Sequence, residues 1–279
     1  MLHKTKQLLV ILSALTLAGE ISAHISLPYT DSDVSYSSVT SLEYRTPEQQ
    51  LRYGEVPFQI GHLWLYKLTN TPSKLIVFIR GACWLNQPQM AHTFPAATAL
   101  AQTCSAVWPI EYSRTGDPGG GWPDDYKVIK AGIQWIGNLS EYGINGEKIV
   151  IVGHSAGGHL ALLAGINFPN DNTGVGLAAI ADIVKYASGT NDCETAAPLF
   201  MGSAFALTKE SYRKATAVGL NFHCRTLLLH GTVDSIVNIS QSVLPNATTS
   251  GLAEAGHFDW VHPGIKTSQT LLDSLEKLI

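Results

Sequence analysis

The sequence predicts an α/β protein built on an open, mostly parallel central sheet with helices on both faces. Short apolar runs fit strands that are covered on both faces. These runs are Leu75–Ile79, Ala106–Ile110, Lys148–Val152, Gly176–Ala181 and Thr226–Leu229. Segments of helical length alternate with them, at residues 90–103, 124–138, 156–168 and 264–278. A chain of 279 residues with 45% hydrophobic side chains can fill one large core around such a sheet.

Three further segments complete the order of elements. Residues 26–61 are polar and turn-rich, which favours an N-terminal segment that wraps around the domain. Residues 62–68 alternate polar and apolar side chains as a half-exposed strand does. Residues 183–215 interrupt the alternation of strands and helices, and they contain Gly, Asn, Pro and Ser. We expect them to form a loop-rich, cap-like insertion over one end of the sheet.

The first 23 residues have the pattern of a secretory signal peptide. Lys4 and Lys6 precede an apolar run at Leu8–Ala18, and Ile21-Ser22-Ala23 offers a small-residue cleavage site. The run is too short for the ~20 residues that a membrane-spanning helix needs. We therefore expect an exported protein, periplasmic or secreted, with a mature domain at residues 24–279 and no membrane span.

Charge and composition exclude several classes of partner. Eighteen Lys and Arg residues against 22 Asp and Glu give a net charge of −4, and no basic run is present that could follow a nucleic acid backbone. The chain has neither a C-x-x-C nor an H-E-x-x-H motif. His154 and His159 are five residues apart, a spacing that does not stack them on one helical face. We expect no nucleic acid partner, no metal and no cofactor.

Four cysteines would meet an oxidising compartment if the protein is exported, and three complete pairings of them are possible. Cys83 and Cys193 both lie toward the carboxyl end of the predicted sheet, whereas Cys104 and Cys224 precede strands at the opposite end. This topology favours a disulfide between Cys83 and Cys193.

The most informative motif follows the strand at Lys148–Val152. The chain continues as Gly153-His154-Ser155-Ala156-Gly157 and then as a helix-forming run. A G-x-S-x-G sequence between a strand and a helix is the pattern of a nucleophile elbow, where small neighbours let the serine hydroxyl project from a tight turn. Glycine-rich turns also bind phosphate, but the glycine patterns of nucleotide-binding loops are missing. We predict that Ser155 is a nucleophile and that the amide of Ala156, at the helix start, faces a developing negative oxygen.

A serine nucleophile needs a base, and an acid that orients the base. Asp234 lies on the loop that follows the strand at Thr226–Leu229, and His257 lies on a loop before the last helix. The order Ser155, Asp234, His257 is the order that this architecture uses. Asp182 also follows a predicted strand and is the alternative acid, although the loop position favours Asp234.

The second amide of an oxyanion hole should come from the turn after Leu75–Ile79, which reads Arg80-Gly81-Ala82-Cys83-Trp84. With this turn, the Gly-Asp-Pro-Gly-Gly-Gly-Trp-Pro loop at 116–123 and the elbow, the chain resembles the α/β-hydrolase superfamily. The resemblance is to its esterase and arylformamidase (kynurenine formamidase-like) branch, and it extends over nearly the whole chain from about Tyr53. It implies an α/β-hydrolase fold, with the amide of Ala82 or Cys83 in the oxyanion hole.

Two residues depart from the His-Gly-Gly-x-Trp turn of that branch. Arg80 replaces the His and Ala82 replaces the second Gly. Backbone amides survive either change, so neither change excludes an oxyanion hole. If the second position requires a positive φ, Ala82 costs about 1 to 2 kcal/mol there. Arg80 is permanently charged and needs a carboxylate or solvent.

Three aromatic residues lie on loops that leave strands, namely Trp84, Tyr112 and Trp122. They predict an aromatic wall for a compact acyl or aryl group, covered by the insertion at 183–215. Each of the three could equally fill the core.

These features together predict an exported serine hydrolase that cleaves small carboxylic esters, or N-formyl amides, through an acyl-enzyme. One alternative is a serine peptidase that acts on short peptides, although the chain has no room for a propeller or a long substrate-selecting cap. Another is a non-catalytic binding protein on a decayed hydrolase scaffold, which Arg80 and Ala82 motivate. The sequence does not determine the physiological substrate or the oligomeric state.

Overall fold

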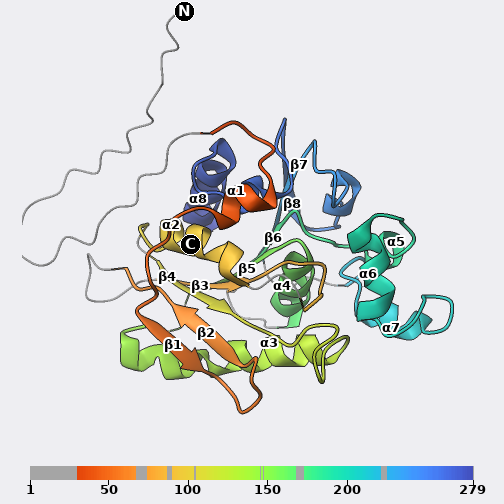
Figure 1. Cartoon of the computed structure of the whole chain (residues 1–279), viewed down its shortest axis with the longest axis horizontal. Coiled ribbons are helices and arrows are strands. Elements are labelled where there is room, and N and C mark those ends of the chain that lie inside the picture. The colour runs from red at the N-terminus through yellow and green to blue at the C-terminus, as the bar shows by residue number, and fades with distance from the viewer. Residues whose placement is uncertain are drawn as a thin grey trace, which may run out of the picture.

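An eight-stranded sheet runs through the computed structural model, with helices on both of its faces (Figure 1). The structure describes residues 30–66, 74–86, 90–103, 105–144, 146, 148–167, 173–220 and 225–278. The predicted signal peptide at 1–23 lies outside these residues, as do Cys104 and Cys224, so the expectations about them stay predictions.

The sheet is parallel except at one edge. Its strands are β1 (Gln49–Arg52), β2 (Ile60–Leu63), β3 (Leu75–Ile79), β4 (Ala106–Ile110), β5 (Ile149–His154), β6 (Thr173–Leu177), β7 (Arg225–Gly231) and β8 (Thr248–Leu252). Their order across the sheet is β1-β2-β4-β3-β5-β6-β7-β8. Strand β2 runs antiparallel to both β1 and β4, and the other neighbouring pairs are parallel. The mostly parallel sheet is confirmed.

Helices cover the sheet in two layers (Figure 1). The α-helices are α1 (Tyr36–Thr40), α2 (Phe94–Leu100), α3 (Asp124–Trp135), α4 (Ala156–Asn167), α5 (Ile183–Tyr186), α6 (Asp192–Phe200), α7 (Lys209–Lys214) and α8 (Lys266–Leu278). Short 3₁₀ helices are η1 (Met90–Thr93), η2 (Ile136–Tyr142), η3 (Ile239–Ser242) and η4 (Phe258–Val261). In β3, Leu75, Val77 and Ile79 join the core beneath α3 and α4, whereas Ile76 and Phe78 join the core beneath α1, α2 and α8. The alternating directions of strand side chains explain this division.

The expected strand at Gly176–Ala181 lies earlier in the chain, as β6. The strand ends because Ala178 has a φ of 47°, which turns the backbone out of the sheet. The amide of Ala178 donates to Leu229 O at 2.8 Å. Residues 178–181 are fully buried all the same, so their apolar character marked burial and not strand conformation.

Two strands at the edges of the sheet were not expected from the sequence. All residues of β1 are exposed except Leu51, and all residues of β8 are exposed except Leu252. Edge strands of this kind carry no apolar run, so hydrophobic patterning cannot find them. The described part of the N-terminal segment contacts Asp259, near the end of the chain, through the amides of Asp33 and Val34, and it adds β1 to the sheet.

The insertion at 183–215 is helical, and the expectation of a loop-rich segment was wrong. It contains α5, α6 and α7, which lie together at one side of the molecule beside α4 (Figure 1). Helix α6 begins with a capping box in which Asn191 Oδ1 accepts from the amide of Glu194, and the Glu194 carboxylate accepts from the amide of Asn191, both at 2.9 Å. The polar residues that suggested loops thus include the caps of short helices.

Candidate active site

Ser155 occupies a tight turn between β5 and α4. Its φ is 57°, in the left-handed region that non-glycine residues rarely adopt. The amide of Ser155 donates to Leu177 O at 2.8 Å, which ties the turn to the end of β6. The strained turn predicted for a nucleophile elbow is present at this serine.

The glycines beside the serine are needed for packing. A Cβ on Gly153 would lie 2.1 Å from Gly157 O, and a Cβ on Gly157 would lie 2.1 Å from Arg80 O and 2.2 Å from Ile79 O. All of these neighbours are backbone atoms, which cannot rotate away. The start of α4 therefore lies directly against the end of β3. The turn at residues 80–84, which was predicted to supply an oxyanion amide and is called the oxyanion turn below, begins there.

Asp234 and His257 come together on the loops that follow β7 and β8. His257 Nδ1 lies 2.8 Å from Asp234 Oδ2, and Asp234 Oδ1 accepts from the amides of Ile236 at 2.9 Å and Val237 at 2.8 Å. Burial alone would raise the pKa of the Asp234 carboxyl, but hydrogen bonds from His230, His257 and the Val237 amide lower it overall. An ionised acid thus orients the imidazole of His257.

Asp182, the alternative acid, has a different role. It is the N-cap of α5, and its Oδ1 accepts from the amide of Lys185 at 3.0 Å. Its own amide donates to Gln241 Oε1 at 2.8 Å. The carboxylate that contacts His257 belongs to Asp234.

His154 joins the serine turn to the histidine loop. Its Nε2 lies 2.9 Å from His257 O, and the two rings are 4.7 Å apart between centroids. Burial holds the pKa of His154 well below its ordinary value, and the neighbouring His257 and His92 lower it further. The neutral ring therefore donates from Nε2 to the carbonyl oxygen. Because Ser155 follows His154 directly, this contact places the serine and the imidazole of His257 in one neighbourhood.

Within the described residues, Ser155 Oγ and His257 form no hydrogen bond. Nucleophile–base bonds in unliganded enzymes are often long and tighten only with substrate. Both residues are nearly enclosed, with 2% of Ser155 and 5% of His257 exposed.

The turn after β3 passes beside the serine. A Cβ on Gly81 would lie 3.1 Å from Ser155 Cβ. Ala82, Cys83 and Trp84 have φ values of 85°, 50° and 59°, so the positive φ foreseen for Ala82 is present and its two successors share it. Each such residue costs about 1 to 2 kcal/mol relative to an ordinary backbone conformation.

Three backbone amides of the serine turn and the oxyanion turn have no acceptor among the described residues. Among the described residues, the N–H groups of Ala82, Cys83 and Ala156 donate to no acceptor. Ala156 is the first residue of α4, where helix geometry leaves the amide without an intrahelical partner. Unpaired amides on two elements that meet at a serine are what an oxyanion hole requires.

Arg80 has the carboxylate that its charge requires. It is 1% exposed, its Nε donates to Glu111 Oε1 at 2.6 Å, and its Nη1 donates to Gly81 O at 2.8 Å. Its guanidinium carbon lies 4.4 Å from the centroid of the Tyr112 ring. Arg80 thus holds the carbonyl group of Gly81, near the start of the oxyanion turn, in a fixed position.

The sequence did not identify Glu111 as this partner. The parallel pairing of β3 with β4 sets Ile79 opposite Ile110, which places Arg80 beside Glu111. Finding the pair from the sequence would have required the strand order, which local patterns do not give.

Two of the three expected substrate-contacting aromatics are fully buried. Trp84 and Tyr112 are each 0% exposed. Trp84 stacks on Phe200 of α6 at 4.9 Å between centroids, and the Tyr112 hydroxyl donates to Arg80 O at 3.3 Å. Neither ring offers a free face, so both support the site from within the core. Trp122 is partly buried and stacks on Tyr126 at 5.6 Å.

His159, on α4, connects the oxyanion turn to the insertion. Its Nδ1 accepts from Trp84 Nε1 at 3.3 Å, and its Nε2 lies 2.5 Å from Ala215 O. Burial lowers the pKa of His159 to about 4, so the ring is neutral and donates from Nε2. The role is structural: one imidazole links three segments.

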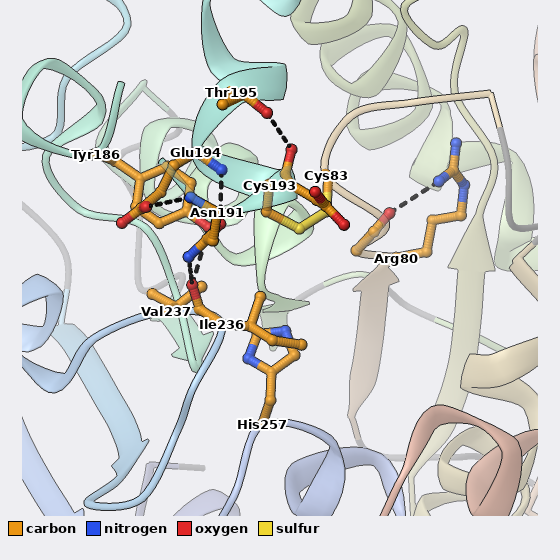
Figure 2. The surroundings of a disulfide bond; sticks show 12 residues. Arg80, Cys83, Tyr186, Asn191, Cys193, Glu194, Thr195, Ile236, Val237 and His257 are labelled. Carbon is orange, nitrogen blue, oxygen red and sulfur yellow. Dashed lines mark hydrogen bonds between the residues drawn. A yellow bond between two sulfur atoms is a disulfide. The ribbon is translucent and has the colours of Figure 1, made fainter. Parts of the chain in front are cut away.

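The expected disulfide between Cys83 and Cys193 is present, with a Cα–Cα separation of 5.0 Å (Figure 2). It joins the oxyanion turn to the second residue of α6. In Figure 2 the His257 imidazole points toward this bond.

Over the described ranges, no three potential ligands among His, Cys, Asp and Glu side chains gather as a metal site would need. The same ranges contain no helix with the length and apolar character to cross a membrane.

Replacing Gly157 tests the contact between α4 and the oxyanion turn. Gly157→Ala should lower the free energy of unfolding by about 1 to 3 kcal/mol, because its Cβ would overlap backbone oxygens. Denaturant unfolding measures the change. The matched control is Gly137→Ala in η2, where a Cβ meets nothing within 4 Å and stability should stay level or rise by up to about 1 kcal/mol. Equal stability of both variants and the parent would contradict the described packing.

The chain is similar to known proteins in sequence and in fold. The family model BD-FAE matches residues 62–248, more than half of the chain. Esterase LipC of Mycobacterium tuberculosis is 28% identical over 120 residues, which are 42% of this chain and 29% of that protein. The probable carboxylic ester hydrolase LipM of the same organism is 32% identical over 127 residues, 43% of this chain and 28% of that protein. The chain thus spans less than a third of the length of these relatives.

Solved structures match over most of the chain. Esterase B from Lactobacillus Rhamnosis aligns with a TM-score of 0.70 and 18% identity, covering 87% of this chain and 89% of that chain. A truncated carbohydrate esterase from gut microbiota aligns with a TM-score of 0.72 and 19% identity, covering 84% and 96%. These likenesses establish the fold. The predicted α/β-hydrolase fold is confirmed, and the chain belongs to the BD-FAE family.

Proposed function

We propose that this chain is a serine hydrolase that cleaves small carboxylic esters through an acyl-enzyme. The observation that carries the proposal is the pair of His257 and Asp234, joined at 2.8 Å, beside a serine on a strained turn. The amides of Ala82, Cys83 and Ala156, which donate to no acceptor in the described part of the chain, support the proposal because such a reaction needs donors for a developing negative charge.

In the proposed reaction, His257 Nε2 takes the proton of Ser155 Oγ as the oxygen attacks the ester carbonyl. Asp234 holds Nδ1 and stabilises the imidazolium, and the free amides stabilise the tetrahedral oxyanion. His257 then protonates the leaving alcohol. A water molecule, deprotonated by His257, releases the acid and restores the serine.

The names of the similar proteins support an ester substrate. Two relatives are named as an esterase and a probable carboxylic ester hydrolase, and one solved structure is titled a carbohydrate esterase. The small exposed fractions of Ser155 and His257 favour a compact acyl group. N-formyl amides need only the same catalytic groups, so a screen of short acyl esters against N-formylkynurenine separates the two substrate classes.

Ser155→Ala should lower kcat for a p-nitrophenyl acyl ester by on the order of 10⁴ to 10⁶, because no other group supplies the nucleophile. A fluorophosphonate probe should label the parent at Ser155 and leave the variant unlabelled. Turnover by the variant at the parent's rate would refute the nucleophile. A folded parent that neither turns over esters nor reacts with the probe would favour the binding protein, and cleavage of short peptides alone would favour the peptidase.

The two candidate acids are compared in a matched pair. Asp234→Asn should lower kcat on the order of 10³ to 10⁴, because the amide cannot stabilise the imidazolium of His257. Asp182→Asn should leave kcat within about twofold of the parent, because Asn is also a good N-cap for α5. Steady-state rates on one ester decide the matter, and a reversed ranking would assign the acid to Asp182.

We also propose that the protein is exported. Lys4, Lys6 and the apolar run at Leu8–Ala18 support this, as does the disulfide, because such bonds persist in oxidising compartments. Expression of the full chain in a host with a secretory pathway should yield a mature protein that begins at His24, measured as the intact mass of the periplasmic or medium fraction. Uncleaved protein that is confined to the cytoplasm would count against export.

A further inference from the structure

The oxyanion turn has an unfavourable backbone that the surrounding structure must hold in place. Three consecutive residues without a glycine, Ala82 to Trp84, have positive φ values. Such a segment returns to an ordinary conformation unless its neighbours over-determine it. A change of this conformation would reorient the amides of the turn.

Noncovalent contacts fix the two ends of the turn. Arg80 Nη1 donates to Gly81 O at 2.8 Å at the start. At the end, the amide of Leu85 donates to Ala82 O at 2.9 Å, and Trp84 is held by Phe200 and His159. The middle residue, Cys83, is held by its disulfide to Cys193, 110 residues further along the chain.

The helix that receives this disulfide is itself connected to the acid loop (Figure 2). Asn191, the N-cap of α6, donates from Nδ2 to Ile236 O at 3.1 Å, and the Tyr186 hydroxyl donates to the same oxygen at 3.2 Å. The amide of Ile236 donates to Asp234 Oδ1 at 2.9 Å. A continuous path therefore runs from the oxyanion turn, through the disulfide and the start of α6, to the carboxylate that orients His257.

A reductant can reach this bond, because Cys83 and Cys193 are both only partly buried. Dithiothreitol would transfer two electrons and two protons to the two sulfur atoms, leaving two thiols and the cyclic disulfide of the reagent.

From these contacts we propose that the Cys83–Cys193 disulfide is a positioning element of the active site. It keeps the oxyanion amides aligned with Ser155, Asp234 and His257, and it makes ester hydrolysis depend on the oxidised state of the two cysteines. This inference rests on the proposed function. Cys193 acts through Cys83, and it does not touch the reacting atoms.

The test compares the parent with Cys193→Ala and with Thr195→Ala. Thr195 is an exposed control on the same helix, and among the described residues its hydroxyl donates to Asp192 O alone. Cys193→Ala should lower kcat for a p-nitrophenyl ester by at least about tenfold, toward the 10² to 10³ that loss of one oxyanion donor causes. KM and the acid limb of the pH–rate profile should stay near those of the parent, because His257 and Asp234 remain paired. Thr195→Ala should match the parent in all three quantities.

Reduction provides the reversible version of the same test. Dithiothreitol should lower the parent's kcat by the same factor, in step with alkylation of Cys83 and Cys193 in peptide mapping, and reoxidation should restore it. Cys193→Ala keeps Cys104 and Cys224, so its insensitivity to dithiothreitol would exclude effects through those residues. An unchanged kcat in a parent whose disulfide is demonstrably reduced would overturn the proposal.

Amide hydrogen exchange measures the conformational stability of the turn and needs no substrate. The peptide containing Ala82 to Trp84 should exchange at least about tenfold faster in Cys193→Ala than in the parent or in Thr195→Ala. If the parent hydrolyses no ester but the turn exchanges faster in Cys193→Ala, the proposed function fails, whereas the positioning role of the disulfide stands. If the parent hydrolyses esters but Cys193→Ala changes neither the exchange of the turn nor kcat, only the positioning role of the disulfide is refuted.

Discussion

The close approach of two backbones, the start of α4 against the end of β3, determines the geometry of this site. No side chain fits between them, since a Cβ on Gly157 would lie 2.1 Å from Arg80 O. This contact brings the serine turn and the oxyanion turn together. The Ala156 amide has no acceptor among the described residues because it begins α4. One packing requirement therefore sets the proposed nucleophile close to the proposed oxyanion donors, and glycine is the residue that meets it.

The departures from the usual turn sequence change how the turn is held. Arg80 replaces a His, yet it finds a buried carboxylate at Glu111 and binds the carbonyl of Gly81. Burying such a pair is costly unless its hydrogen bonds are made. Nε and Nη1 of Arg80 make theirs, and the bond from Nη1 holds the backbone of the turn, whereas Nη2 has no partner among the described residues. Ala82 lacks the freedom of glycine, so the conformation must be stabilised by its neighbours. These observations describe a turn whose conformation is held by Arg80 and by the other neighbours of the turn.

The sequence predicted those parts of the site that depend on local patterns. The elbow around Ser155 follows from glycines in a strand–turn–helix context, and Asp234 was preferred to Asp182 from its loop alone. The sequence does not decide between pocket and core for Trp84 and Tyr112, because an aromatic residue after a strand looks the same whether it faces a ligand or the core; the structure buries both. The shift of β6 has a similar cause, since an apolar run records burial and Ala178 leaves the sheet through its backbone angle. Glu111 required the order of strands, a property of the whole fold.

Three contacts join the insertion at 183–215 to the oxyanion turn and to α4. Phe200 stacks on Trp84, Ala215 O accepts from His159, and Cys193 is bonded to Cys83. Each link reaches either the oxyanion turn or α4, the helix that follows Ser155. A displacement of the insertion would therefore also displace the backbone of that turn or of that helix. A segment bound in this way is part of the wall of the site. Its short helices thus contribute to the alignment of the proposed oxyanion donors.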